Sequence, residues 1–252
     1  MASLEGQPLT GKSCAQGCRR QLPPVITIDG PSGVGKGTIS RLLAEKLGWR
    51  VLNSGTLYRL LALAAIRQRV SPDDEVALFT LGQRLDCEFL RREDKDGECV
   101  LLNGRDVTME IHSEVCGGNA SRLARLPKVR EALLNRQRCF RTPPGLVADG
   151  RDMGTRVFPD ADLKIFLTAN PNERTRRRHK QLKAQGTDVN LASLLTEINE
   201  RDRRDRERAV SPLGPADDAV LIDTTDLAVD AVLGRVMGIA MAGSVGGRRV
   251  VV

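Results

Sequence analysis

Aromatic side chains are scarce in this chain of 252 residues, where one Trp, one Tyr and five Phe make up 3% of the sequence. Unpaired bases bind proteins by stacking on aromatic rings, so the shortage weighs against a protein built for single-stranded nucleic acid. Long apolar runs are lacking too, because the longest, around Leu60 to Ile66, is much shorter than the about 18 residues of a membrane span. Residues 1–24 contain no apolar segment of the kind that secretory signals carry. We therefore expect a cytoplasmic protein.

Metal-binding side chains are also few. The six cysteines form no C-x-x-C pair, and the only histidines are His112 and His179. Zinc sites need such residues at close and regular spacing, and this sequence has no such constellation. In a cytoplasmic protein we expect the thiols to be reduced and incidental to function.

Basic residues outnumber acidic ones, 39 to 32, which gives a net charge of +7. Of these 39 residues, 31 are arginine, whose planar guanidinium group can donate two parallel hydrogen bonds to a phosphate. The bias indicates polyanionic partners. Charge alone does not decide between a nucleic acid and a nucleotide.

Short apolar runs alternate with longer amphipathic ones along most of the chain. Strands that alternate with helices predict an α/β fold in which a parallel sheet is covered on both faces. The predicted strands are 25–28, 50–52, 146–148, 163–167 and 220–222, and the predicted helices among them are 36–47, 55–69, 171–185 and 225–241.

Residues 71–110 interrupt this alternation. The sequence Ser71-Pro72-Asp73-Asp74 predicts a helix start, with Ser71 as the N-cap and proline at the first helical position. Two short apolar runs then flank Asp96-Gly97, a pair typical of hairpin turns, and Asn103-Gly104 marks another turn. We expect a small antiparallel insertion here, followed by two helices around 111–124 and 128–141.

A glycine-rich loop lies between the first predicted strand and the helix after it. Its backbone N–H groups suit phosphate oxygens, the helix N-terminus adds a positive dipole, and Lys36 can reach the β- and γ-phosphates. In the general phosphate-loop pattern a Ser or Thr follows the lysine, but here Gly37 comes first, which weakens Thr38 as a direct ligand of Mg²⁺. The ATP-binding residues expected from this loop are Gly30, Pro31, Ser32, Gly33, Val34, Gly35, Lys36, Gly37 and Thr38.

Other classes of phosphate-loop protein fit less well. The N-K-x-D motif that reads guanine in GTPases does not occur in the sequence. The dinucleotide-binding fingerprint fails because Thr38 stands where its last glycine would be. The sequence therefore favours a small-molecule kinase.

Three further segments carry polar side chains suited to a second phosphate compound. One begins a predicted helix, one follows a predicted strand at the sheet edge where ligands bind, and one lies on a helix with spacing that puts its side chains on one face. Taken alone, the last segment is more typical of a solvent-exposed helix with ion pairs. The candidates are Ser54 and Arg59, then Asp149, Arg151 and Asp152, and finally Arg201, Asp205 and Arg208.

Four segments together resemble the motifs of the bacterial cytidylate kinase family, in that family's order. They are ITIDGPSGVGKGT at 26–38, SGTLYR at 54–59, ADGRDMGT at 148–155 and RDRERAVSPL at 204–213. The resemblance extends over roughly residues 25–241. It implies a P-loop kinase core with a five-stranded parallel sheet, a LID that closes over ATP, and a monophosphate-binding region enlarged by a small antiparallel β insertion.

The resemblance also implies domain boundaries. The kinase domain would span 25–242, with its core formed by 25–54 and 143–242, the monophosphate-binding region by about 55–142, and the LID by about 170–187. Residues 1–24 are expected to be a disordered leader, longer than the family requires, and 243–252 a flexible tail.

Roles for single residues follow from the resemblance as well. Asn53 stands where the family often has aspartate, so a charged role is not expected there. Lys36, Arg151 and the LID residues Arg174 and Arg178 would be catalytic. CMP would be bound by Ser121, Arg130 and Asp152 at the base, by Arg59, Arg151 and Arg208 at the phosphate, and by Arg201 and Asp205 at the pentose, with Ser54 and Asp149 beside them.

The implied reaction transfers the γ-phosphoryl group of Mg-ATP to CMP or dCMP. No general base is required, because the acceptor phosphate is already largely anionic at neutral pH. We expect a monomer that acts on these small molecules, without a nucleic-acid or membrane partner. The alternatives are a kinase for UMP or for a non-nucleotide acceptor, a nucleotide-dependent nucleic-acid-binding protein, and a nucleotide sensor that has lost its acceptor residues.

Overall fold

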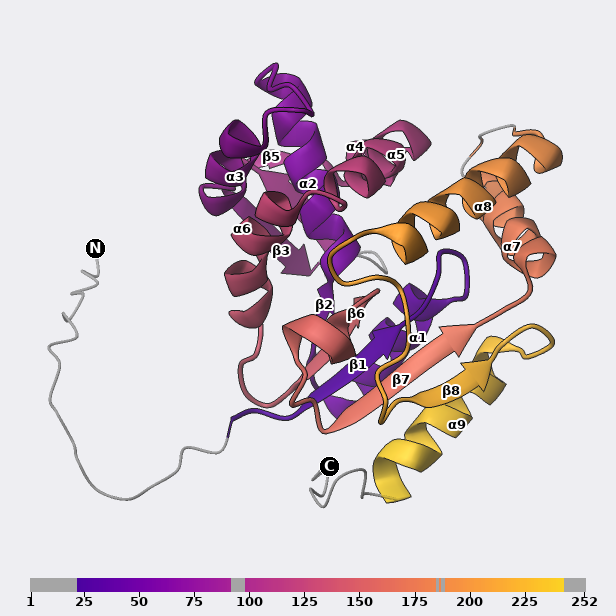
Figure 1. Ribbon diagram of the computed structural model, residues 1–252. Coiled ribbons are helices and arrows are strands. Elements are labelled where there is room, and N and C mark those ends of the chain that lie inside the picture. The colour runs from indigo at the N-terminus through magenta and orange to yellow at the C-terminus, as the bar shows by residue number, and fades with distance from the viewer. Residues whose placement is uncertain (1–21, 92–97, 185, 187–188, 243–252) are drawn as a thin grey trace, which may run out of the picture.

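The computed structural model describes residues 22–91, 98–184, 186 and 189–242. A five-stranded sheet runs through the lower part of the molecule in Figure 1, and all of its neighbouring strands are parallel. The predicted α/β fold with a five-stranded parallel sheet is therefore confirmed. In spatial order the strands are β2 (Arg50–Asn53), β6 (Leu146–Gly150), β1 (Val25–Asp29), β7 (Leu163–Thr168) and β8 (Val220–Asp223).

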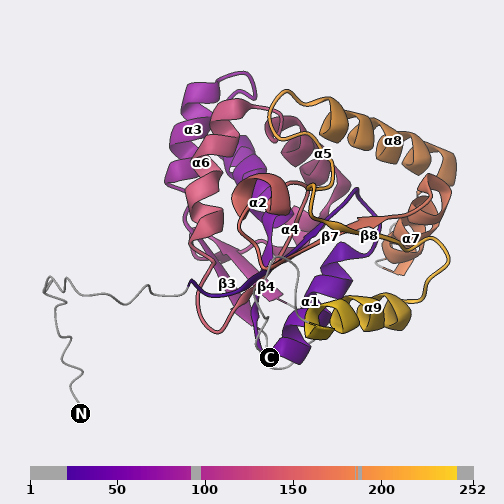
Figure 2. The same ribbon diagram turned by 60° about the horizontal axis from the view of Figure 1, so that its bottom comes forward.

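Helices cover both faces of this sheet because its side chains point alternately to either side. On β1, Ile26 and Ile28 belong to one apolar cluster and Val25 to the other. Figure 2 shows α1 and α9 together on one side of the sheet, with α2 and α6 on the opposite side. These helices are α1 (Lys36–Leu47), α9 (Val229–Ala242), α2 (Ser54–Arg67) and α6 (Pro127–Arg138).

A separate antiparallel sheet follows α3 in the chain. Its first two strands confirm the predicted hairpin, although the turn at Asp96-Gly97 lies outside the described residues. Asn103 and Gly104 have φ of 50° and 72°, and two such residues make a tight turn that adds a short third strand. The strands are β3 (Cys87–Arg91), β4 (Glu98–Leu102) and β5 (Arg105–Asp106).

The predicted helix start at Ser71 is wrong. Helix α3 (Glu75–Gln83) begins three residues later than predicted, and its N-cap is Asp74, whose Oδ1 accepts a hydrogen bond from the N–H of Ala77 at 2.9 Å. Ser71 instead accepts a hydrogen bond from the N–H of Asp73, within a turn. Both Ser and Asp are good caps, and the aspartate determines where the helix begins.

The single helix predicted around 111–124 is two helices, α4 (Thr108–His112) and α5 (Glu114–Leu123). Between them Ser113 is extended, with a ψ of 151°, and its Oγ accepts a hydrogen bond from the N–H of Cys116 at 3.2 Å. The serine therefore ends one helix and caps the next.

Two further helices, α7 (Pro171–Ala184) and α8 (Leu191–Glu207), lie side by side beyond the end of β7 (Figure 1). Leu182, Leu194 and Ile198 form the small apolar cluster between them. A single π-turn, η1 (Met153–Val157), follows β6.

Helix α9 begins at Val229 and not at residue 225 as predicted. The carboxylate of Asp223 accepts hydrogen bonds from the N–H and the hydroxyl of Thr225, at 2.8 and 2.6 Å. This side-chain turn keeps the residues after β8 out of the helix.

The described part of the chain begins at residue 22, within the predicted leader 1–24. The carbonyl oxygen of Pro23 accepts a hydrogen bond from Nε of Arg141 at 2.7 Å, and that of Pro24 accepts one from the N–H of Leu146. Residues 1–21 and the predicted tail 243–252 lie outside the described residues. Within the part of the chain that the structure describes, no helix has the length and apolar character needed to cross a membrane.

Candidate functional site

Glycines shape the loop between β1 and α1. A Cβ on Gly30 would lie 2.2 Å from the carbonyl oxygen of Leu167, so no larger residue fits there. Gly35, the N-cap of α1, has a φ of 92°, which glycine adopts without strain. Lys36 begins α1 and is buried, and its Nζ donates a hydrogen bond to the carbonyl oxygen of Pro31 at 2.7 Å. The loop therefore curls around the positive end of a helix dipole, as an anion-binding loop does.

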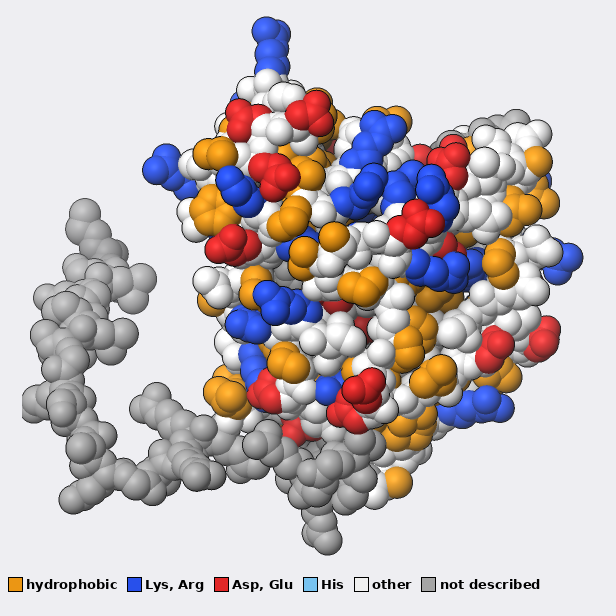
Figure 3. Space-filling view, viewed as in Figure 1, with side chains coloured by type: hydrophobic (Ala, Val, Ile, Leu, Met, Phe, Trp, Pro, Cys, Tyr) orange, Lys and Arg blue, Asp and Glu red, His pale blue; other side chains and the backbone are white. Residues whose placement is uncertain are grey.

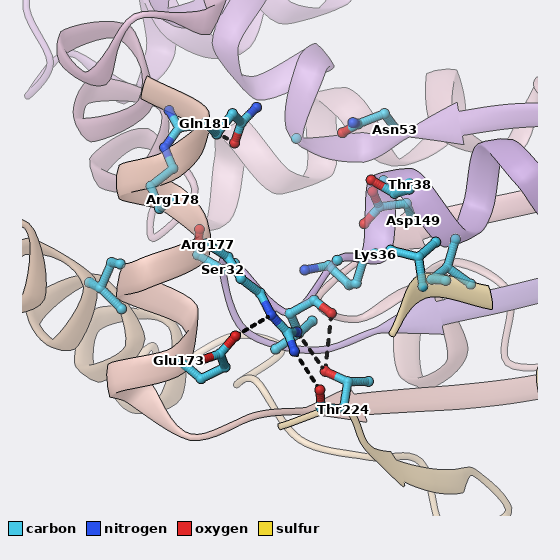
Figure 4. Close-up of a pocket in the computed structure, with 18 of the residues that line it drawn as sticks. Ser32, Lys36, Thr38, Asn53, Asp149, Glu173, Arg177, Arg178, Gln181 and Thr224 are labelled. Atoms are coloured by element: carbon cyan, nitrogen blue, oxygen red, sulfur yellow. Dashed lines mark hydrogen bonds and ion pairs between the residues drawn. The ribbon is translucent and has the colours of Figure 1, made fainter. Parts of the chain in front are cut away.

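A cleft of about 860 Å³ opens beside this loop and is lined by residues 32–38 of it. Its volume is within the range of small-molecule sites. Seven Lys and Arg line it against four Asp and Glu, so an anionic ligand is favoured. Figure 4 shows Lys36, Asp149 and Thr38 close together, with Arg177 and Arg178 approaching from α7. The basic residues are Lys36, Arg41, Arg59, Arg151, Arg177, Arg178 and Arg201.

Asp149, near the end of β6, faces the start of α1. Its Oδ2 lies 3.5 Å from where a Cβ on Gly37 would be, so the carboxylate lies against the loop. Burial raises the pKa of Asp149, although the charge of Lys36 opposes the shift. Burial, and then the positive charge of Arg151, lowers the pKa of Lys36 to about 7. Lys36 is therefore only partly protonated at neutral pH, and the binding of an anion would favour its charged form.

Arg151 and Arg201 reach the cleft from different elements. Arg151 follows β6, and its Nε donates a hydrogen bond to Oδ2 of Asp205 on α8 at 2.9 Å. Burial, and then the charge of Arg151, lowers the pKa of Arg201 to about 10. Nε of Arg201 has no hydrogen-bond partner among the described residues. A buried guanidinium with a free donor is a site for an anion.

Arg59 reaches the cleft from α2 and is held by the corner between α4 and α5. It donates hydrogen bonds to the carbonyl oxygens of Ile111 and Ser113, the latter at 3.1 Å. A Cβ on Gly117 would lie 2.7 Å from its Nη2, so the glycine makes room for the guanidinium. The residues of α4 and α5 thus fix an arginine of α2.

Four of the predicted residues, Ser121, Arg130, Asp152 and Arg208, do not line the cleft but lie in a buried polar cluster. Arg130 and Asp152 form an ion pair, and Nη2 of Arg208 lies 3.6 Å from Oδ1 of Asp152. Oγ of Ser121 accepts a hydrogen bond from Arg204 at 3.4 Å. The structure therefore brings Arg130, Asp152 and Arg208 together apart from the cleft, with Ser121 buried beside Arg204.

Open hydrogen-bonding capacity remains within this cluster. Nε of Arg130, Nη2 of Arg208 and Oε1 of Gln137 are buried and have no hydrogen-bond partner among the described residues. The guanidinium of Arg130 also lies 5.9 Å from the centre of the Tyr58 ring. Unpaired buried donors and acceptors are costly, so such a group indicates a place for a polar ligand.

The arginines of α7 divide between two environments. Arg177 and Arg178 line the cleft, where Arg177 donates to the carbonyl oxygen of Thr224 at 2.6 Å and Arg178 pairs with Glu114. Arg174, which was predicted to face the donor phosphates, does not line the cleft. Its side chain is buried because α8 supplies a buried carboxylate, Asp202, 2.7 Å away.

Ser54 is buried at the first position of α2 and does not line the cleft. Its Oγ would lie 2.7 Å from a Cβ on Gly150, so it packs against the turn after β6. Asn53 does line the cleft, and its side chain accepts a hydrogen bond from the N–H of Thr56 at 3.3 Å. Asn53 is thus the N-cap of α2.

Sequence reasoning missed Asp29, the last residue of β1. Its Oδ1 and Oδ2 accept hydrogen bonds from the N–H groups of Met153 and Gly154, at 2.9 and 2.8 Å. Burial raises its pKa to about 7, although these two N–H groups oppose the shift. Asp29 therefore fixes the turn that carries Arg151 and Asp152. No local pattern marks it, since Met153 is 124 residues away along the chain.

Comparison with known proteins gives a consistent result. Residues 26–242 match the family model described as cytidylate kinase. The chain is 60% identical over 214 residues to the cytidylate kinase of Stutzerimonas stutzeri, covering 85% of this chain and 93% of the relative. It is 57% identical over 210 residues to that of Pseudomonas paraeruginosa (83% and 92% covered) and 56% identical over 220 residues to that of Aeromonas salmonicida (87% and 95% covered). The chain therefore belongs to the cytidylate kinase family of ATP-dependent nucleoside-monophosphate kinases.

Proposed function

We propose that the chain transfers the γ-phosphoryl group of ATP to CMP or dCMP, giving ADP and CDP or dCDP. Family membership supports the reaction class. One observation in this chain carries the proposal: the phosphate loop and the three arginines Arg59, Arg151 and Arg201 line one positively charged cleft. Two anionic nucleotides can bind side by side there because the cleft screens their mutual repulsion.

The donor half of the proposed site is built around the phosphate loop. Its N–H groups and the dipole of α1 would hold the phosphates of ATP, and Lys36 would exchange its hydrogen bond with Pro31 for a phosphate oxygen. Arg177 and Arg178 would approach the same phosphates from α7. Since Arg178 is now paired with Glu114, it must leave that carboxylate to do so.

The acceptor half would hold the monophosphate by Arg59, Arg151 and Arg201, which share the cleft. Arg201 replaces the Arg208 that the resemblance implied, because Arg208 does not line the cleft. The base of the monophosphate would enter the polar cluster that contains Arg130 and Asp152. Cytosine offers an amino donor where uracil offers an oxygen acceptor, so the Asp152 carboxylate would favour cytosine. The open polar atoms of this cluster support a ligand there, and we propose that Ser121 contributes its hydroxyl to the same base.

Mg²⁺ is proposed to accompany ATP. The hydroxyl of Thr38 and the carboxylate of Asp149 line the cleft beside Lys36, and oxygen ligands of this kind suit Mg²⁺. The remaining ligands of the ion would be phosphate oxygens and water. Thr38 and Asp149 would hold it, directly or through water. When bound, the ion would neutralise charge on the β- and γ-phosphates.

Catalysis would consist of positioning and charge screening. The acceptor phosphate has a second pKa near 6, so it is already a nucleophile at neutral pH and needs no general base. The loop and Lys36 would align the donor, and Arg151, oriented by Asp205, would align the acceptor. Closure of α7 over the cleft would exclude water and so prevent hydrolysis of ATP.

The organisation of the molecule is proposed to follow the same division. The core would comprise 25–54 and 143–242, the monophosphate-binding region about 55–142 and the LID about 170–187. We also propose a cytoplasmic monomer without a nucleic-acid partner. On the face shown in Figure 3, Lys and Arg side chains gather over α5 and the nearby end of α8, with acidic side chains among them. Proteins that bind nucleic acids typically carry a continuous basic patch or stripe instead.

A substrate panel tests this function. With Mg-ATP fixed, a coupled assay for ADP would compare kcat/KM for CMP, dCMP, UMP, AMP and dTMP. We expect CMP and dCMP to be preferred. Preference for AMP or dTMP, or ADP release at the same rate without any acceptor, would refute the proposal.

A further inference from the structure

Arg174 has an environment that the proposed reaction does not use. Its side chain is 1% exposed, although it lies on the first turns of α7 beside a cleft lined by other arginines. All three of its guanidinium nitrogens have partners, and these belong to different segments. Arginine suits such a buried position because its planar guanidinium group can donate to several partners at once.

The first partner is the phosphate loop. Nη1 of Arg174 donates a hydrogen bond to the carbonyl oxygen of Ser32 at 3.0 Å. The C=O and N–H of one trans peptide unit point in opposite directions, so a Ser32 carbonyl that is directed at Arg174 turns the N–H of Gly33 away from it. Gly33 lines the cleft, so this N–H would be available to a phosphate bound there.

Close packing reinforces this contact. Gly33 has a φ of 81°, and a Cβ there would lie 3.1 Å from the Cβ of Arg174 and 3.2 Å from its carbonyl oxygen. The loop therefore rests directly on the first turn of α7. Nε of Arg174 also donates to the carbonyl oxygen of Ala169, which fixes the guanidinium relative to the end of β7.

The second partner is α8. Nη2 of Arg174 lies 2.7 Å from Oδ2 of Asp202, and both side chains are almost completely buried. The other oxygen of Asp202, Oδ1, has no hydrogen-bond partner among the described residues, so Arg174 is what holds this carboxylate. Asp202 lies on α8 between Arg201, which lines the cleft, and Asp205, which orients Arg151.

We propose that Arg174 is a positioning residue shared by both halves of the site: it directs the Gly33 N–H toward the donor phosphates and, through Asp202, sets the position of the acceptor residues of α8. It contacts neither nucleotide. The identity of the two ligands rests on the proposed function. Loss of Arg174 should therefore weaken the binding of two ligands at once, whereas loss of a side chain that contacts one nucleotide should weaken mainly that one.

The variants must separate positioning from stability. Arg174→Met alone would leave Asp202 buried and unpaired, which is strongly destabilising. The double variant Arg174→Met/Asp202→Leu removes both charges, and buried ion pairs replaced by apolar residues of similar size often leave stability unchanged. Arg176→Met is the matched control, because Arg176 lies on the same helix with a side chain 74% exposed.

Isothermal titration with AMP-PNP and with CMP, each alone, is the measurement, with thermal melting as the check on folding. In the double variant we expect both dissociation constants to rise by about tenfold at an unchanged melting temperature. In the control we expect both to stay within about twofold of the wild type. A double variant that binds both ligands normally, or that loses affinity for only one, would overturn the proposal.

Two further outcomes are distinguishable. If the double variant does not fold, Asp202→Asn keeps the shape of the side chain and removes its charge, and a normal dissociation constant for CMP would then overturn the link to α8. Weak binding of CMP by the wild-type protein would count against the proposed function instead. The acceptor found in the substrate panel would then replace CMP in the titration.

Discussion

Nε of Arg151 lies 2.9 Å from Oδ2 of Asp205, and both side chains are largely buried. The arginine follows a strand of the parallel sheet and the aspartate lies on α8, so this ion pair joins two elements that are far apart in the sequence. Burial alone would raise the pKa of Asp205, but the charges of Arg151 and Arg201 lower it. The carboxylate is therefore ionised at neutral pH and can orient Arg151.

The variant Asp205→Asn should lower kcat/KM for CMP by about 30-fold, roughly 2 kcal/mol of transition-state stabilisation, because Arg151 loses its charged anchor. Steady-state kinetics with saturating Mg-ATP measures the effect. Glu207→Gln is the control, since Glu207 on the same helix makes an exposed ion pair with Arg203 and should change kcat/KM less than twofold. Equal kinetics for the two variants would contradict the role of Asp205.

Binding of ATP should be accompanied by proton uptake. With a pKa of about 7, Lys36 is mostly neutral at about pH 8, and the phosphates of ATP raise its pKa because an opposite charge favours the cation. We expect uptake of most of one proton, seen as a calorimetric enthalpy that depends on the ionisation enthalpy of the buffer. The variant Lys36→Arg, whose guanidinium stays charged, should abolish the uptake. Equal uptake by this variant would assign the proton to another group.

Asp29 should make stability depend on pH. Its pKa rises from 3.8 to about 7 on folding, so the folded state holds this proton more tightly, and its contribution is fully present below about pH 4 and lost as the pH rises to 7. The variant Asp29→Asn has no titrating carboxylate at this position, so its stability does not fall for this reason as the pH rises. Its free energy of unfolding relative to the wild type should therefore improve between pH 4 and 7, by on the order of a few kcal/mol. Urea unfolding at several pH values measures this, and a constant difference would disprove it.

The choice of base should depend on Asp152. Replacing this carboxylate by an amide, in Asp152→Asn, offers an N–H donor to the oxygen of uracil. We expect the ratio of kcat/KM for CMP to that for UMP to fall by at least about tenfold. A ratio that stays constant while both values fall would mean that Asp152 only maintains the fold through its ion pair with Arg130.

Local patterns explain what could be predicted from the sequence. The strand that ends at Asp29, the glycines after it and the helix that begins at Lys36 are contiguous, and strand and loop chemistry suffice to predict them. Helix starts were less secure, because Ser71 and Asp74 are both suitable N-caps and only the fold selects one.

Long-range partners explain what could not be predicted. Helix α7 carries Arg174, Arg176, Arg177 and Arg178 within five residues, and their spacing does not tell which one lies against α8. Which arginine does so depends on Asp202, and this residue lies in a run of charged residues that is typical of a solvent-exposed helix. The polar cluster around Asp152 was predicted through resemblance, but its separation from the cleft depends on packing that no motif records.

The strand order has one more consequence. The chain leaves the parallel sheet at the end of β2 and returns at the start of β6, and these two strands are neighbours. Because the two strands are parallel, the chain leaves at one edge of the sheet and returns at the other, so everything from α2 to α6 is joined to the sheet at both edges. One apolar cluster also continues from Leu52 of β2 and Leu146 of β6 into α2, α3 and α6, so the segment and the sheet share a core. The wall of the cleft that carries Arg59 is therefore held in place by the same core that supports the sheet.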